Sequence, residues 1–176
     1  MRHPTSPAGF TIVEILIVMS LLGIVASLAI MGTRQARVRT AETAAVSALR
    51  TINQAQFAFM QVCGNQSYAP TLVSLSTPPP GSDSAFLSLD LAQSDPLPKS
   101  GYLFQLGGTP NPDAVATCTG VIPLAGYFLT ADPLTPGHSG TRFFGTNSDR
   151  VIYGDAVTYV GNMPESGAPG HGVEVR

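Results

Sequence analysis

The chain has 176 residues, which is enough for one membrane-inserted segment and one modest domain. Nine Lys and Arg residues against 11 Asp and Glu residues give a net charge of −2, which excludes the strong basic field that nucleic-acid binding requires. Most of the 18 Gly and 15 Pro residues lie beyond residue 31, where Leu and Ile are scarce, and this composition favours a small, loop-rich β domain.

The first nine residues form a short polar leader. Arg2 supplies a positive charge, and Pro4 and Pro7 interrupt any helix. We therefore expect residues 1–9 to form a non-helical leader.

An apolar segment follows over residues 10–32, and its single formal charge is Glu14. A helix of this length would extend roughly 30 Å, the thickness of the hydrocarbon core of a bilayer. The segment is therefore predicted to form a transmembrane helix.

Glu14 is the unusual residue of that helix. Burying a carboxylate in a membrane costs about 2.5 kcal/mol or more, so the side chain needs a cationic partner. No Lys or Arg lies between Arg2 and Arg34. The partner must therefore come from another molecule or from a new amino terminus made by cutting the chain nearby.

The sequence from Gly9 to Glu14 is G-F-T-I-V-E. It resembles the prepilin peptidase site of type IV pilins and of the pseudopilins of type II secretion. The resemblance implies that prepilin peptidase cleaves after Gly9 and that Phe10 becomes an N-methylated amino terminus. It also implies that Glu14 pairs with the Phe10 ammonium of a neighbouring subunit and so sets the assembly register. The implied partners are the peptidase, other pilin subunits in a homopolymer or mixed filament, and an inner-membrane assembly platform.

Two other interpretations of the amino terminus stay open at this point. A secretory signal peptide with a cleavage site near residues 26–29 would need an apolar region about twice the usual length. A plain signal anchor would place Glu14 at the level of the lipid headgroups. The Gly9–Phe10 junction argues against the plain anchor.

Two signals disagree about the orientation of the apolar segment in the membrane. Arg34, Arg37 and Arg39 flank its far end, which the positive-inside rule would place in the cytoplasm. The resemblance implies the opposite: an amino terminus in the cytoplasm and a domain in the periplasm before assembly, and an extracellular pilus or periplasmic pseudopilus afterwards.

Residues 33–63 contain no Gly or Pro, so the helix is expected to continue as an amphipathic half. Apolar side chains recur there at steps of three and four residues, which predicts one buried stripe. The stripe consists of Val38, Ala41, Ala45, Ala48, Ile52, Ala55, Phe59 and Val62. Phe57, Phe59 and Met60 are expected to anchor the following domain, and Gly64-Asn65 to end the helix.

Residues 64–176 are predicted to form a globular β domain. A proline-interrupted connection over residues 65–99 precedes four short runs rich in aromatic and β-branched residues, 102–106, 126–131, 141–144 and 150–153. A sheet of about four antiparallel strands needs a helix on one face to be stable. The expected class is α+β, with the long amino-terminal helix packed on the sheet as in the pilin fold. The Gly- and Pro-rich tail 161–172 is expected to be mobile.

The chain has two cysteines, Cys63 and Cys118. A domain outside the cytoplasm favours a disulfide between them, and two buried thiols are the alternative. The three histidines are scattered and there is no Cys-x-x-Cys pair, so we predict no metal site and no cofactor.

We find no catalytic motif. The sequence Gly137-His138-Ser139-Gly140 lacks the spacing of a nucleophile elbow and favours a hairpin turn. Asp132, Asp149 and Asp155 could bind calcium, but without EF-hand spacing solvated turn carboxylates are favoured. The chain is therefore not expected to be an enzyme.

The prediction is a structural subunit of a type IV pilus-like helical filament. One alternative is a pseudopilin that drives protein export by type II secretion. Another is a membrane-anchored binding domain that never polymerises.

Overall fold

The computed structural model describes residues 9–175, apart from the side chains of residues 28–32. The chain divides into two compact units, Met1–Arg37 and Val38–Arg176. Except for Gly9, the predicted leader lies outside the described residues, as do the last side chains of the predicted membrane span. Within the described part of the chain, no helix is both long enough and apolar enough to qualify as a membrane span.

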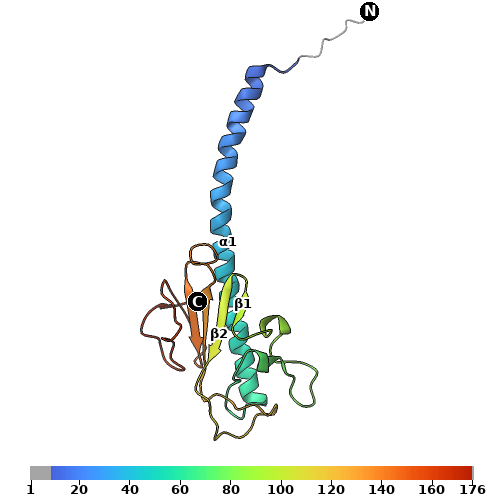
Figure 1. Ribbon diagram of the computed structural model, residues 1–176, viewed down its shortest axis with the longest axis vertical. Helices are drawn as coiled ribbons and strands as arrows, with labels where there is room; N and C mark the ends of the chain where they lie inside the picture. Colours follow the sequence, from blue (N-terminus) through green and yellow to red (C-terminus); the bar gives the residue numbers. More distant parts are fainter. Residues whose placement is uncertain (1–8, 176) are drawn as a thin grey trace, which may run out of the picture. The chain divides into compact units, whose positions relative to one another are not determined.

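The amino-terminal helix α1 spans Ile12–Val62 (Figure 1). Its carboxyl-terminal part, from Ala45 onward, buries one side in the core of the β domain. The helix ends where predicted, because the Gly64 N–H bonds to the Phe59 carbonyl at 2.7 Å and the next two residues, Asn65 and Gln66, have φ values of 47° and 68°. A side chain at Gly64 would meet the Ser67 carbonyl oxygen, so this close turn requires glycine.

The sheet has six antiparallel strands in sequence order, not four. Its strands are β1 Leu97–Lys99, β2 Tyr102–Gly107, β3 Phe128–Pro133, β4 Phe143–Asn147, β5 Ile152–Asp155 and β6 Val173–Glu174. The predicted strands correspond to β2–β5, and the two that were missed lie at the edges. The three-residue β1 contains Pro98, which an edge strand tolerates, and β6 has two residues in a Gly-rich tail.

The core lies between one face of the sheet and residues 45–63, which include the last turns of α1 (Figure 1). Buried residues of the connection that follows the helix, such as Leu72, Leu75 and Leu87, complete it. Strand register sets Ala131 between Phe104 on β2 and Phe144 on β4, so a small side chain separates two large ones. All three are buried, as are Leu49, Ile52 and Phe59 of the helix.

The predicted stripe is correct in its middle and wrong at its end. Ala45, Ala48, Ile52, Ala55 and Phe59 are buried. Val62 is 66% exposed, because the buried face turns toward Cys63 at the end of the helix. Phe57, a predicted anchor, is 40% exposed and lies against the guanidinium of Arg150, 4.3 Å from its ring centroid.

Two buried polar side chains of α1 join it to the rest of the domain. Asn53 donates from Nδ2 to Thr146 Oγ1 on β4 at 2.9 Å and accepts from the Tyr127 hydroxyl at 2.9 Å. Gln56 bonds to both backbone groups of Ala69, at 3.0 and 2.9 Å. Both side chains are almost fully buried, so these bonds fix the helix against its neighbours in one register.

Asn53→Ala is expected to lower the free energy of unfolding by about 2–4 kcal/mol, because it leaves two buried hydroxyls without their partner. Urea denaturation of the detergent-purified full chain would measure this. Thr51→Ala, on the exposed side of the same helix, is the matched control and should change stability by less than about 0.5 kcal/mol. Equal midpoints for the two variants would contradict this role of Asn53.

The carboxyl-terminal segment covers the outer face of the sheet. Tyr159 and Met163 pack over Gly145 of β4, where a Cβ would lie 2.9 Å from each. The Asn147 side chain donates to the carbonyls of Pro164 and Gly167 at 3.1 and 2.7 Å. The expectation of a mobile tail over residues 161–172 is therefore replaced by a segment tied to the sheet.

Candidate functional site

The predicted processing junction lies just before the first turn of α1. Gly9, Phe10 and Thr11 are non-helical and exposed, with Phe10 at 76% exposure. Thr11 caps the helix: its Oγ1 accepts from the Glu14 N–H and its carbonyl from the Ile15 N–H, both at 3.2 Å. The Gly9–Phe10 peptide bond is thus held outside the helix.

Thr11 was not singled out from the sequence, although a signal for it exists. Thr11-Ile12-Val13-Glu14 has the spacing of a capping box, in which the first hydroxyl and the last carboxylate each bond to the other residue's N–H. Of these two bonds, the structure shows the one from the Glu14 N–H to the Thr11 hydroxyl, and no described bond joins the Glu14 carboxylate to the Thr11 N–H. The Glu14 carboxylate forms no hydrogen bond or ion pair with the described residues.

The other polar side chains in this part of α1 are satisfied within the helix. The Ser20 hydroxyl donates to the Leu16 carbonyl and the Ser27 hydroxyl to the Ile24 carbonyl, each at 2.8 Å. Over residues 12–27, Glu14 is the one polar side chain without a described hydrogen bond or ion pair. Its charge in the first turn suits the helix dipole, but burial against apolar groups would demand a cation.

Large apolar side chains surround Glu14 on every side of the helix. The exposed ones are Phe10, Ile12, Val13, Ile15, Leu16, Ile17, Val18, Met19, Leu21, Leu22, Ile24 and Val25. A continuous apolar surface of this extent is not stable in water and marks a site of contact with other apolar groups. Gly9, Phe10 and Glu14, the residues to which the sequence assigns processing and assembly, therefore lie together at the exposed, apolar amino-terminal end of α1.

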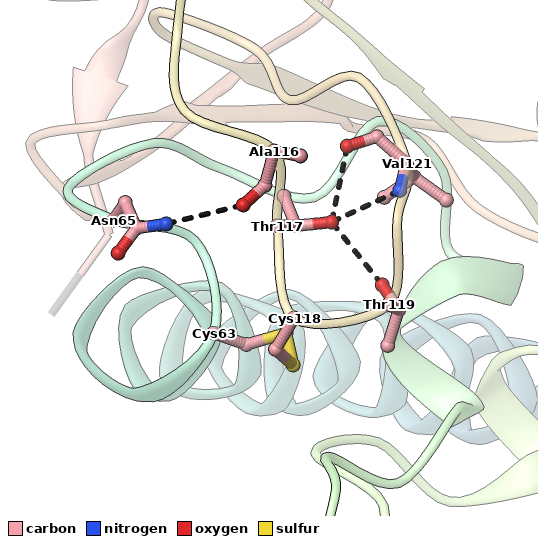
Figure 2. The surroundings of a disulfide bond; sticks show 7 residues. All are labelled: Cys63, Asn65, Ala116, Thr117, Cys118, Thr119 and Val121. Carbon is pink, nitrogen blue, oxygen red and sulfur yellow. Dashed lines mark hydrogen bonds between the residues drawn. A yellow bond between two sulfur atoms is a disulfide. The ribbon is translucent and has the colours of Figure 1, made fainter.

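The disulfide between Cys63 and Cys118 is present (Figure 2). The backbone supports it, because the Cys118 N–H donates to the Cys63 carbonyl at 3.0 Å and Asn65 donates to the Ala116 carbonyl at 3.2 Å. Thr117 bonds through its hydroxyl to both backbone groups of Val121 at 3.0 Å. The loop over residues 109–123 is thereby fixed at the carboxyl-terminal end of α1.

The three aspartates considered for calcium bond to protein groups instead. Asp132 accepts from the Thr158 hydroxyl at 2.6 Å, and Asp149 from the Gly167 N–H at 2.6 Å. Asp155 pairs with His171 Nδ1 at 2.8 Å, and this hydrogen bond lowers the pKa of Asp155. No group of three or more acidic, His or Cys side chains within residues 9–175 is placed to hold a metal ion. The aspartates instead attach the carboxyl-terminal segment to the sheet.

Burial raises the pKa of Asp132 above its ordinary value of 3.8. At pH values just above 3.8, Asp132 keeps its proton in the native state but has released it in the unfolded chain. The contribution of Asp132 to the free energy of unfolding therefore falls as the pH rises through this window. Asp132→Asn retains an acceptor for Thr158 and does not titrate. We expect its unfolding free energy to rise relative to the wild type across that window. Denaturation curves at several pH values would measure the difference, and a pH-independent difference would contradict the account.

The Gly137-His138-Ser139-Gly140 segment forms the predicted hairpin turn. Gly137 donates its N–H to the Gly140 carbonyl at 2.8 Å. The Ser139 hydroxyl is engaged with both backbone groups of Thr135, at 3.0 and 3.2 Å. Its hydroxyl therefore has a structural role in the turn.

Comparison with known proteins supports the amino-terminal interpretation. Residues 6–30 match the family model of the prokaryotic N-terminal methylation motif, which is the signature of type IV pilins and pseudopilins. No curated protein and no solved structure matches the chain.

Proposed function

We propose that this chain, which carries the amino-terminal signature of type IV pilins and pseudopilins, is a structural subunit of a helical filament. Prepilin peptidase cleaves the precursor after Gly9, and the new amino terminus at Phe10 is methylated. The mature chain is then extracted from the inner membrane into a fibre whose core consists of packed copies of the apolar segment over residues 10–32.

The observation that carries this proposal is the unpaired Glu14. Within residues 12–27 every other polar side chain bonds to its own helix, and large apolar side chains surround the carboxylate. Cleavage after Gly9 creates a positive charge four residues before Glu14 in each copy. One copy can thus supply the cation that the next copy lacks.

The packing of these helices replaces the lipid contacts that each subunit loses when it leaves the membrane. Relative to exposure in water, burial of apolar surface contributes roughly 25 cal/mol per Å², so packing of a dozen large side chains per copy offsets the loss of the lipid contacts. Heterologous contacts that do not close into a ring extend such an assembly without limit. Glu14 sets the axial register, because an unpaired buried charge is penalised by about 3–5 kcal/mol.

The partners in this proposal are prepilin peptidase, further subunits of the same or related type, and an inner-membrane assembly platform. Before assembly, the amino terminus faces the cytoplasm and the β domain faces the periplasm. The fibre is an extracellular pilus or a short periplasmic pseudopilus for type II secretion.

Electron microscopy of sheared surface fibres, with peptide identification, tests the proposal. Fibres that contain this chain are expected, and they should be absent from a strain that lacks prepilin peptidase. Chain found only in periplasmic fibres would identify the pseudopilus form. Mature chain that stays membrane-bound without any fibre would overturn the filament function in favour of an anchored binding domain.

A further inference from the structure

A groove lies between α1 and β4 in the β domain. Its volume is about 580 Å³, which is enough for a few side chains of another molecule. Three arginines line it, Arg39 and Arg50 from the helix and Arg142 from the residue before β4. Half-buried Val46 supplies an apolar surface, and the buried Phe144 ring lies beneath the Arg142 guanidinium. The groove therefore combines positive charge with apolar contact area.

The positive charge of the groove is only partly balanced by the residues that line it. The salt bridges among the described residues are Lys99–Asp90 and His171–Asp155, so none of the three arginines is in one. The Arg142 guanidinium lies over the Phe144 ring, 5.3 Å from its centroid, and keeps its charge. Glu42 is the carboxylate that lines the groove, and its Oε1 already accepts from the Thr141 N–H and hydroxyl at 2.9 and 2.7 Å. Three arginines against one carboxylate leave the groove with a net positive charge, which an acidic group of another molecule could balance.

A complementary surface lies on the disulfide-bound loop over residues 109–123, which we call the tip loop. It exposes Asp113 together with Val115 at 72% and Ile122 at 61% exposure. No described residue forms a hydrogen bond or ion pair with Asp113. The disulfide and the Thr117–Val121 bonds hold this loop in a fixed shape before any partner binds (Figure 2).

The groove and the tip loop lie at different levels of the same helix. Val46 lines the groove and Cys63 holds the tip loop, and 17 helical residues correspond to roughly 25 Å. The tip loop therefore does not reach the groove of its own molecule. A contact between them joins two copies head to tail and repeats without closing.

We propose that the arginine groove of one copy receives the tip loop of the next copy. Asp113 pairs with the groove arginines, and Val115 packs against Val46. Charge distribution along the chain favours this arrangement, because nine of the 11 acidic residues but only four of the nine basic residues follow Gly64. The proposal rests on the filament function and names a second contact surface outside the helical core.

Charge reversal in the full-length chain tests the pairing. Asp113→Arg or Arg50→Glu alone should reduce the yield of fibres at least about tenfold, because each places like charges together. The double variant should recover most of the yield. Asp83→Arg, which reverses another exposed carboxylate, is the matched control and should assemble normally. An intact disulfide and an unchanged denaturation midpoint would show that each variant folds.

A photo-crosslinking amino acid at Val115 tests the contact without relying on fibre yield. We expect crosslinked dimers in which Val115 is joined to the peptide that contains Val46 or Phe144, in membranes and in fibres. Val157, which is 57% exposed and follows β5, is the control position. Crosslinks only to other proteins or to other surfaces would overturn the groove contact. If the wild-type chain still formed fibres with a processed amino terminus, the filament function would stand and only the groove contact would be wrong.

Discussion

Replacement of Glu14 with alanine is expected to abolish fibres while leaving cleavage after Gly9 intact. The variant leaves the Phe10 ammonium of a neighbouring copy unpaired in an apolar core, which costs about 3 kcal/mol or more for each added subunit. Since 1.4 kcal/mol is a factor of ten, fibre yield should fall at least about a hundredfold. Quantitative immunoblotting of sheared fibres would measure the loss, and the mass of the cell-bound chain would measure cleavage.

Two further variants separate charge from shape. Glu14→Gln keeps the shape of the side chain but not its charge, and it should fail in the same way as alanine. Ser20→Ala removes a hydroxyl that already bonds to the Leu16 carbonyl, so it should assemble like the wild type. Normal fibres from Glu14→Gln would show that the carboxylate charge does not set the register.

Loss of the Cys63–Cys118 disulfide is expected to be the largest single destabilisation of the β domain. The cross-link joins residues 55 positions apart, and a loop of this length corresponds to about 4 kcal/mol of unfolded-state entropy. Reduction of the wild type, or the variant Cys63→Ala/Cys118→Ala, should therefore shift the urea midpoint strongly downward. The tip loop would also lose its fixed position at the end of α1.

The double variant provides the control for the reductant. A reducing agent should lower the midpoint of the wild type to about that of the double variant and leave the double variant unchanged. Cys118 is exposed, so the reductant has access to the bond. If oxidised and reduced wild type unfolded at the same urea concentration, the bond would not contribute to stability.

Local sequence signals predicted the long helix and the four central strands. Residues 33–63 contain no Gly or Pro, and the central strands have aromatic and β-branched runs. The edge strands were missed because Pro98 lies in β1 and β6 has only two residues. Their pairing is supplied by neighbouring strands rather than by their own composition.

The buried face of α1 could not be predicted fully, because its polar members depend on distant partners. Asn53 bonds to Thr146, 93 residues away, and Gln56 bonds to Ala69 in the loop that follows the helix. In the sequence alone these residues are typical of an exposed face. The exposed Phe57 is the converse case, since Arg150 covers its ring from another part of the chain.

The amino-terminal motif is recognisable from the sequence because its residues are local, and residues 6–30 match the N-terminal methylation motif. Gly9, Phe10 and Glu14 lie within six residues, and the absence of a nearby cation can be counted directly. Thr11 could have been added from its capping-box spacing. The arginine groove could not have been found, because Arg50 and Arg142 are brought together only by packing of the helix on the sheet.

The mass of the intact mature chain tests the central claim most directly. We predict a chain that begins at Phe10 and carries one added methyl group on its amino terminus. This end would supply the positive charge that Glu14 lacks within its own helix. A chain that begins at Met1, or at a residue beyond the apolar segment, would contradict the filament model.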